Sequence, residues 1–375
     1  MSPSLKIGIS GSTLLPTRNG GRPDGMAVYT RHLFEGLQNL SQETSLWLYK
    51  KDEDYHGQLD DANYFPHTFG FLSLISALSS RKIIISPSID IFHTTDYRSF
   101  RIDCPSVSTL YDAIPLAHPE MANPHFRNIK NFILKRSAKY SDHIITVSNY
   151  AAKEIVEYYE IPSRNISVVP CGIGSSWLEP LNEINWNRTL IKRNIRSGYF
   201  LFVGIIQPRK NLDTLIKAHD HLHKSLRQKH PLVVVGRKGW SCDDVIEKLK
   251  RKISINEAHW FNDVNTEIEL KHLYAGAMAF VYPSLHEGFG LPLLEAFASG
   301  LPAMISSTTS LPEVSQGIAV EVDPFDIDGM SKAMVKLLDP VDRIERINAG
   351  KKRAREMSWE NTAKQTLEVY KKVLA

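Results

Sequence analysis

The sequence of 375 residues has few of the features that mark specialised protein classes. Its three cysteines, Cys104, Cys171 and Cys242, are odd in number and far apart, which argues against a disulfide framework. No apolar run approaches the roughly 18–20 residues of a membrane-spanning helix. The formal net charge of +4 is small for this length and does not suggest a nucleic-acid binder. We therefore expect an ordinary globular protein that binds no nucleic acid.

The first residues also lack the basic start and the apolar stretch of a secretory signal peptide, so we expect a cytoplasmic protein. Peripheral contact with the inner face of the membrane stays open, because segment 126–140 combines apolar and basic residues at helical spacing. The alternative is the charged outer face of a packed helix. The residues concerned are Phe126, Ile129, Phe132, Ile133 and Leu134 with Arg127, Lys130, Lys135, Arg136 and Lys139. The oligomeric state stays open.

Short apolar runs alternate with longer helical patterns along the chain, which is typical of parallel sheets with crossover helices. The length suits two domains, so we expect two doubly wound, Rossmann-like α/β domains. Segment 171–197 carries Gly, Ser, Pro, Asn and Trp without a clean period and is interpreted as a linker. The first domain is expected at 1–172 and the second at 173–357, followed by an amphipathic helix at 359–374.

The expected elements place the candidate residues in loops that leave the strands. Strands are predicted at 6–10, 45–50, 91–93, 106–110, 143–147, 166–169, 199–203, 232–235, 259–261, 279–282 and 303–306. Helices are predicted at 26–40, 126–140, 151–158, 212–223, 243–252, 267–275, 293–298 and 327–338. In such sheets, ligands bind beyond the carboxyl ends of strands, where helices begin.

The strongest local signal is the Gly-rich loop that follows strand 279–282. Gly288 and Gly290 allow a ligand to approach the backbone, and Pro292 suits the first position of a helix because it needs no amide donor there. The start of that helix directs amide groups and a positive dipole end at the loop. The loop therefore predicts a phosphate cradle.

Two carboxylates flank this cradle. Glu295, in the first turn of the expected helix, could accept hydrogen bonds from two ribose hydroxyls. Glu287 lies in the loop and faces whatever is attached beyond the phosphates. The structural alternative is a Gly-rich connection with an acid near a helix N-terminus, which is common.

Arg209 and Lys210 form a second cluster, in the loop before the helix expected at 212–223. The dipole of a helix favours anions at its N-terminus, so it does not explain two cations there. A diphosphate bound beside them would explain them. Lysine supplies a point charge and arginine a bidentate fork. The alternative is a solvated basic turn.

Taken together, these segments resemble the retaining glycosyltransferases of family GT4, or group 1, which have the GT-B fold. Segment 280–302, which contains the E-x7-E pattern from Glu287 to Glu295, carries the resemblance. It continues, in the family's order, through segments 147–149, 168–172, 199–211, 310–314, 322–324 and the helix from 358.

The resemblance implies that the two domains face a cleft and that the last helix, 358–375, crosses back to the first domain. The first domain would bind the acceptor and the second the nucleotide sugar, without a metal or another cofactor. The expected catalytic residues are Glu287, Asp112 and Lys210. The expected substrate-binding residues are Gly25, Arg209, Lys210, Glu287, Gly288, Phe289, Gly290, Leu291 and Glu295.

Within this resemblance, Lys210 matches the lysine that neutralises the leaving diphosphate. Many relatives also have an arginine directly after the strand glycine, where this chain has Ile205, and Arg209 is expected to substitute. Glu295 would hold the ribose, and Glu287 with the backbone of Phe289 and Gly290 the transferred sugar.

The first domain matches the family less closely. Gly25 is the best match to the loop whose amides contact the diphosphate or the acceptor. Tyr111 replaces the histidine of many relatives, which leaves Asp112 as the carboxylate expected to bind sugar hydroxyls or orient the acceptor. His118 is more simply a surface residue. The Asp-x-Asp pattern at 326–328 is read as a helix cap and that at 52–54 as an exposed loop, not as metal sites.

The expected reaction is transfer of a hexose to a glycan or lipid-linked acceptor with retention of the anomeric configuration. Segments 111–116 and 208–211 resemble polysaccharide mannosyltransferases, which favours mannose from GDP-mannose over a UDP-hexose. A sugar-nucleotide epimerase and an inactive binding module of the same fold remain alternatives. A dinucleotide oxidoreductase is disfavoured, because no GxGxxG opens either half.

Overall fold

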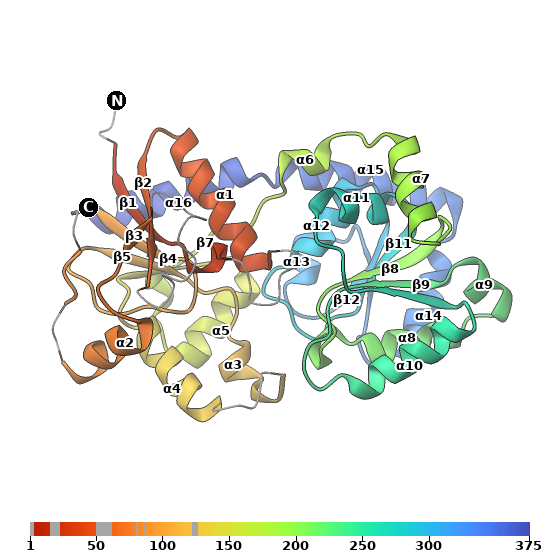
Figure 1. The fold of residues 1–375 in the computed structure, drawn as a ribbon, viewed down its shortest axis with the longest axis horizontal. Helices are drawn as coiled ribbons and strands as arrows, with labels where there is room; N and C mark the ends of the chain where they lie inside the picture. Colours follow the sequence, from red (N-terminus) through yellow and green to blue (C-terminus); the bar gives the residue numbers. More distant parts are fainter. Residues whose placement is uncertain (1–3, 16–22, 50–61, 80–81, 86–87, 122–126) are drawn as a thin grey trace. The chain divides into compact units, whose positions relative to one another are not determined.

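The computed structural model describes residues 4–15, 23–49, 62–79, 82–85, 88–121 and 127–375. The chain divides into two compact units, one formed by residues 1–172 and 359–375 and the other by residues 173–358. Each unit contains a parallel sheet with helices packed around it (Figure 1). Among the described residues, no helix is both long and apolar enough to cross a membrane.

The sheet of the first unit has the strand order β3-β2-β1-β4-β5-β6-β7. All neighbouring strands are parallel, and the order reverses where β1 pairs with β4. The strands are β1 (Lys6–Ser10), β2 (Glu43–Leu48), β3 (Asn63–Tyr64), β4 (Ile91–Thr94), β5 (Ser106–Thr109), β6 (His143–Thr146) and β7 (Ile166–Val168). Apart from the short edge strand β3, each corresponds to a strand predicted from the sequence.

The helices of the first unit begin at recognisable caps. The Asp24 carboxylate accepts from the Ala27 amide to start α1, and the Ser148 hydroxyl accepts from the Ala151 amide to start α5. The helices are α1 (Gly25–Asn39), α2 (Phe69–Leu78), α3 (Ile114–Ala117), α4 (Arg127–Ala138), α5 (Asn149–Tyr159) and α16 (Trp359–Leu374). The described part of this unit also contains the single turns η1 (Ser12–Leu14), η3 (Pro119–Met121) and η4 (Ser163–Asn165).

The C-terminal helix α16 is part of the first unit although 186 residues of the second unit, 173–358, precede it. It packs along α1, as the blue and red ribbons of Figure 1 show. The approach is close: a Cβ atom added at Gly36 would lie 2.7 Å from the Cβ atom of Ala363. Only a glycine therefore fits on α1 at this crossing.

A buried hydrogen-bond network fastens α16 to the sheet. The Nδ1 atom of His93 lies 2.6 Å from the hydroxyl of Tyr370, and its Nε2 atom lies 2.8 Å from the hydroxyl of Thr109. His93 is fully buried, and burial lowers its pKa to about 3. The imidazole is therefore neutral at physiological pH and can satisfy one hydroxyl as a donor and the other as an acceptor.

We expect this histidine to make the first unit sensitive to acid. Its folded pKa of about 3 lies below the ordinary value of 6.5, so the unfolded chain binds more protons. Its contribution is fully present above pH 6.5 and is lost as the pH falls towards 3, by up to about 4 kcal/mol. Urea unfolding at a series of pH values in this range should show stability rising with pH.

His93→Gln should flatten that pH dependence, whereas His67→Gln, at an exposed position of the same unit, should leave it unchanged. An unaltered slope in the His93→Gln protein would show that the pH dependence comes from other groups.

The sheet of the second unit has the strand order β10-β9-β8-β11-β12-β13, again parallel throughout. Strands β8 and β9 are buried along their whole length, which is why they read as continuous apolar runs rather than alternating patterns. The strands are β8 (Tyr199–Val203), β9 (Leu232–Val235), β10 (Ala258–Phe261), β11 (Ala277–Tyr282), β12 (Ala303–Ser306) and β13 (Val320–Val322).

The prediction of an irregular linker at 171–197 is wrong. This segment contains the helices α6 (Ser175–Leu178) and α7 (Glu183–Lys192). Helix α7 packs against α11 (Glu267–Ala275). Its Leu190 is buried, but its Ile184 and Ile191 are exposed, so apolar residues occur on more than one face and hide the helical period.

The other elements of the second unit are η5 (Pro208–Lys210), α8 (Leu212–Asp220), α9 (Lys224–Lys229), α10 (Asp243–Ser254), α12 (Leu291–Ala298), α13 (Leu311–Ser315), α14 (Ile327–Lys336) and α15 (Pro340–Glu356).

Candidate active site

The two loops singled out in the second half of the sequence leave neighbouring strands. Strand β8 pairs with β9 on one side and with β11 on the other, so the strand order of the sheet reverses at β8 and β11. The carboxyl ends at such a reversal form the usual ligand site of a doubly wound sheet. β8 leads to η5, and β11 leads to the Gly-rich loop. The amide of Leu285 donates to the carbonyl of Arg209 at 2.7 Å and joins the two loops.

A charge cluster lies where these loops meet, with Lys210 and Glu287 buried and Arg209 partly exposed. Lys210 Nζ is 2.6 Å from Glu287 Oε1, and Arg209 Nη1 is 3.1 Å from Glu287 Oε2. Lys210 also donates to the hydroxyl of Tyr282, and its Nζ lies 4.7 Å from the centre of the Tyr282 ring. Arg209 Nη1 further donates to the carbonyl of His286 at 2.9 Å. The structure thus brings together three of the residues predicted to act on substrate.

The cluster joins two basic side chains and one carboxylate. Burial would raise the pKa of Glu287, but the charges of Lys210 and Arg209 outweigh burial and lower this pKa to about 2. Glu287 is therefore a carboxylate at neutral pH. Burial and the Glu287 charge raise the pKa of Tyr282 well above its ordinary value, so Tyr282 stays a neutral hydroxyl. One carboxylate against two cations leaves a site suited to a polyanion.

Ser310 fixes the backbone of the Gly-rich loop. Its buried hydroxyl lies 2.8 Å from the carbonyl oxygen of Glu287 and 3.2 Å from that of Phe289. In a trans peptide the N–H points opposite to the C=O. The amides of Gly288 and Gly290 therefore point away from Ser310.

The start of α12 requires glycine at the end of this loop. Gly290 has φ +104°, a conformation that L side chains rarely adopt. A Cβ atom there would lie 2.5 Å from Leu311 Cδ2. Gly290 precedes the first helical residue, Leu291, so its conformation sets the direction in which the helix N-terminus points.

Asn211, directly after η5, connects the loop that carries Arg209 and Lys210 with two other loops. It has φ +58°, and its side-chain amide donates to the carbonyl of Pro283 at 3.1 Å and to that of Pro324 at 2.6 Å. The carbonyl of Pro283 belongs to the segment that leads from β11 to Glu287. Asn211 thereby holds the ends of η5 and β11 in a fixed relation.

Sequence reasoning did not assign roles to Ser310, Asn211 or Tyr282. All three lie in segments that carried the family resemblance. Their contacts join residues 23, 72 and 113 positions apart, so the local pattern gave no sign of them.

Glu295 is buried in α12, and its carboxylate accepts from the hydroxyl of Tyr274 at 3.0 Å. Its predicted place in the first turn is wrong, because α12 begins at Leu291, before Pro292, and Glu295 falls in the second turn. Gly290, in a left-handed conformation, is the residue directly before this helix.

In the first unit, Gly25 is the exposed first residue of α1, and the adjoining residues 19–22 lie outside the described part of the chain. Asp112 follows β5, where its carboxylate accepts from the Ile114 amide at 3.1 Å and from the Tyr97 hydroxyl at 3.3 Å. The hydroxyl of Tyr111 donates to the carbonyl of Thr95 at 2.8 Å. Tyr111 therefore holds the end of β5 to the end of β4.

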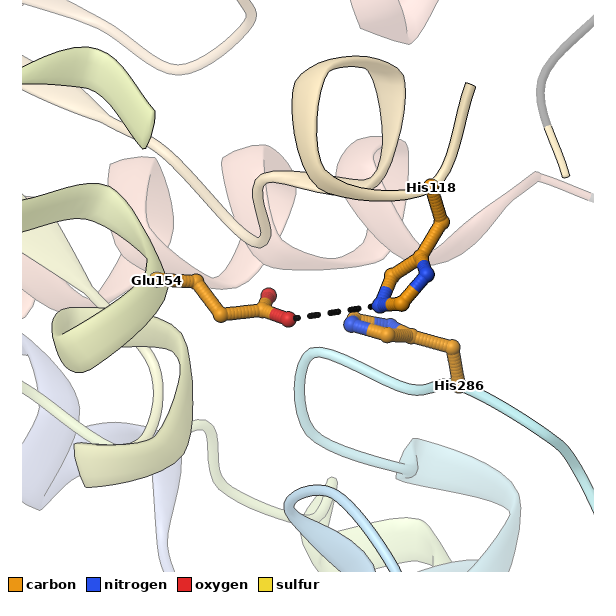
Figure 2. Close-up of side chains that lie close together, drawn as sticks. All are labelled: His118, Glu154 and His286. Atoms are coloured by element: carbon orange, nitrogen blue, oxygen red, sulfur yellow. Dashed lines mark ion pairs between the residues drawn. The ribbon is translucent and has the colours of Figure 1, made fainter. Parts of the chain in front are cut away.

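His118 is at the surface of the first unit, with about a third of its side chain exposed (34%). Its Nε2 atom lies 3.9 Å from Glu154 Oε1, the pair joined by the dashed line in Figure 2, and its Nδ1 atom lies 3.4 Å from Glu120 Oε1. His286, also drawn in Figure 2, belongs to the second unit, in the segment that follows β11.

One of the two Asp-x-Asp patterns is a helix cap, as its position suggested. The Asp326 carboxylate accepts from the Gly329 amide at 2.9 Å and starts α14. The pattern at 52–54 lies outside the described residues, as do Phe126 and the side chains of Arg127, Ile129 and Lys130 in the basic helix.

Comparison with known proteins gives concordant results for both halves of the chain. Residues 190–356 match the family described as "Glycosyl transferases group 1", and residues 23–176 match "Glycosyltransferase Family 4". The O-antigen chain mannosyltransferase B of Escherichia coli is 32% identical over 268 residues, 71% of this chain and 70% of that protein. The serotype-specific mannosyltransferase WbdA of Escherichia coli is 30% identical over 280 residues, but this chain spans only 34% of its length.

Among solved structures, Anabaena Alr3699/HepE in complex with UDP-glucose has a TM-score of 0.73 at 13% identity, with 98% of this chain and 100% of that chain covered. The likeness concerns the fold. Together, the two matched halves and the similarity to the mannosyltransferase of Escherichia coli show that the chain belongs to glycosyltransferase family 4 and is a glycosyltransferase of the two-domain GT-B fold.

Proposed function

We propose that this protein transfers mannose from GDP-mannose to a glycan or lipid-linked acceptor, with retention of the anomeric configuration. The observation that carries the proposal is the cluster of Arg209, Lys210 and Glu287 at the strand reversal of the second unit. A lysine and an arginine side by side suit the diphosphate of a nucleotide sugar. The similarity to O-antigen mannosyltransferases supports mannose as the sugar.

In this proposal, the residues of the second unit divide the donor between them. Lys210 and Arg209 bind the diphosphate, and the N-terminus of α12 adds its amide dipoles. Glu295 accepts from the ribose hydroxyls, and Glu287 with the backbone of Phe289 and Gly290 holds the sugar. Stabilisation of the departing diphosphate is the main catalytic term, and it requires no metal.

The first unit supplies the acceptor side of the proposal. Asp112 binds acceptor hydroxyls, and Gly25, at the N-terminus of α1, offers its backbone to the diphosphate or the acceptor. The Asp112 carboxylate already accepts two hydrogen bonds, which fix its orientation.

A thermal-shift comparison of GDP-mannose with UDP- and ADP-sugars tests the donor, because a ligand that binds only the folded chain raises its Tm. GDP-mannose should give the largest shift, and purified protein should then transfer mannose to an acceptor. A larger shift with UDP-glucose would replace the donor with a UDP-hexose. Conversion of the donor without acceptor would favour an epimerase, and binding without turnover a binding module.

Loss of the Ser310 hydroxyl should lower the activity with the nucleotide sugar more than the stability of the fold. Ser310→Ala removes the hydroxyl that donates hydrogen bonds to the carbonyls of Glu287 and Phe289, so the amides of the loop lose their orientation. We expect kcat/KM for the donor to fall about 10–100-fold, while stability falls by only about 1 kcal/mol. Steady-state kinetics and urea unfolding measure the two effects. Ser225→Ala, which removes an exposed hydroxyl from the same unit, is the control, and equal kinetic losses in both proteins would reject this role.

We also propose that α2 and α4 of the first unit contact an anionic membrane surface that carries the acceptor. The two helices pack against each other (Figure 1). Large apolar side chains are exposed on and beside them, including Leu78 at 78% and Phe132 at 64%. The exposed Arg136 on α4 and Lys82 just after α2 supply positive charge, whereas Lys135 and Lys139 are both paired with Glu160. The membrane contact therefore depends mainly on apolar residues.

Co-sedimentation with anionic lipid vesicles tests this surface. Phe132→Ser should reduce vesicle binding, and Ile191→Ser, at an exposed apolar position of the second unit, should not. Unchanged binding of the Phe132→Ser protein would reject the surface.

A further inference from the structure

Both cations of the charge cluster are bound by one carboxylate. Lys210 contacts one oxygen of Glu287 at 2.6 Å, and Arg209 contacts the other at 3.1 Å. Glu287 and Lys210 are each more than nine-tenths buried. Glu287 therefore uses both of its oxygens on the two groups that would bind a diphosphate.

A diphosphate and Glu287 would compete for these donors. Phosphate oxygens accept the same charge-assisted hydrogen bonds from lysine and arginine as a carboxylate does. In a buried site the repulsion between two adjacent anions is weakly screened. Simultaneous contact of the diphosphate and the Glu287 carboxylate with the same two cations is therefore unfavourable, and one of the two anions has to leave them.

We propose that Glu287 is an internal competitor of the donor diphosphate, which takes over Arg209 and Lys210 when it binds and releases the carboxylate towards the transferred sugar. This inference rests on the proposed function and adds a regulatory step to the same site. It couples the two halves of donor recognition, because Glu287 becomes available to sugar hydroxyls only after the cations have exchanged their anion. A complete nucleotide sugar then gains hydrogen bonds from its sugar hydroxyls to Glu287, whereas a bare anion does not.

The exchange is tested with inorganic pyrophosphate, which has the diphosphate charge but no sugar. Isothermal titration of the full chain should show that Glu287→Gln binds pyrophosphate on the order of tenfold more tightly than the native protein. Glu321→Gln makes the same charge change at an exposed position of β13 in the same unit and should leave the affinity unchanged. Equal or weaker binding by Glu287→Gln would overturn the exchange.

A second measurement, thermal unfolding with and without pyrophosphate, takes into account that Glu287→Gln destabilises the protein. Without the carboxylate, the buried Lys210 and the partly exposed Arg209 lose the negative charge of Glu287, so the Tm of the variant should be lower than that of the native protein. Saturating pyrophosphate should then raise the Tm of the variant by more than that of the native protein. Equal Tm shifts would count against the exchange.

A third variant serves if Glu287→Gln does not fold. Glu287→Asp keeps the charge but shortens the side chain by one methylene group, which weakens both ion pairs. It should bind pyrophosphate more tightly than the native protein, though by less than tenfold.

The outcomes separate this inference from the proposed function. If the native protein binds pyrophosphate and GDP but the Glu287 variants bind no more tightly, only the exchange fails. If neither the native protein nor any variant binds pyrophosphate or a nucleoside diphosphate, the donor site itself fails, and the exchange with it.

Discussion

Lys210→Ala is expected to lower the turnover number of glycosyl transfer by about 10²–10³-fold while the protein stays folded. Lys210 is the cation that approaches Glu287 at 2.6 Å, and its Nζ is held by the hydroxyl and the ring of Tyr282. A charge in this fixed and buried position stabilises the departing diphosphate without reorganisation during the reaction. Most of the loss should appear in kcat, because negative charge grows on the diphosphate as the sugar leaves.

Lys248→Ala is the matched control, because Lys248 is a partly exposed lysine of the same unit that pairs with Asp213. It should leave kcat unchanged. Circular dichroism and thermal unfolding should show that both variants fold. A Lys210→Ala protein with near-normal kcat would refute the role of Lys210, and equal losses in both variants would point to a general effect of charge.

Several elements could be predicted to the residue from the sequence. Strands β1, β9 and β12 and helices α11 and α16 have the bounds expected from their apolar runs. Their signals are local: apolar residues at the spacing of one secondary structure, interrupted by turn residues. The Rossmann-like strand order follows from the same alternation, because consecutive parallel strands need a crossover helix.

Other elements gave no local signal. In α15 the residues buried are Gly350 and Ala354, too small to stand out as an apolar stripe, while Val341 and Ile344 are exposed. In α2 the apolar residues are exposed as well as buried, so no amphipathic period appears. Hydrophobicity alone does not show which side of such a helix meets the core.

The charged residues of the candidate site could be predicted from the sequence, but the contacts between them could not. The loop glycines, the two glutamates and the cations could be found because each lies in a short segment with its own chemistry. The ion pair between Lys210 and Glu287 could not, since it joins residues 77 positions apart. The sequence therefore indicated a phosphate site, and the structure adds that a carboxylate of the protein already contacts its cations.

The close approach of β8 and β9 leads to the prediction with the largest effect on stability. A Cβ atom at Gly236 would lie 1.9 Å from the carbonyl oxygen of Gly204. Neither partner of that contact is a movable side-chain end, so the strand ends must separate. We expect Gly236→Ala to lower the free energy of unfolding by at least about 3 kcal/mol and to reduce the soluble yield. Urea unfolding followed by tryptophan fluorescence measures the change.

The same substitution should disturb the donor site, because the backbone of Gly204 lies against the side chain of Lys210. A Cβ atom at Gly204 would already be 3.4 Å from Lys210 Cε, so a shift of Gly204 changes the position of the ammonium group. Gly317→Ala is the control: Gly317 has φ +77° but nothing within 4 Å of the added atom. It should cost only the strain of a left-handed residue, about 1–2 kcal/mol, and leave donor binding intact. Equal destabilisation in the two variants would mean that backbone strain, and not the clash with Gly204, dominates at Gly236.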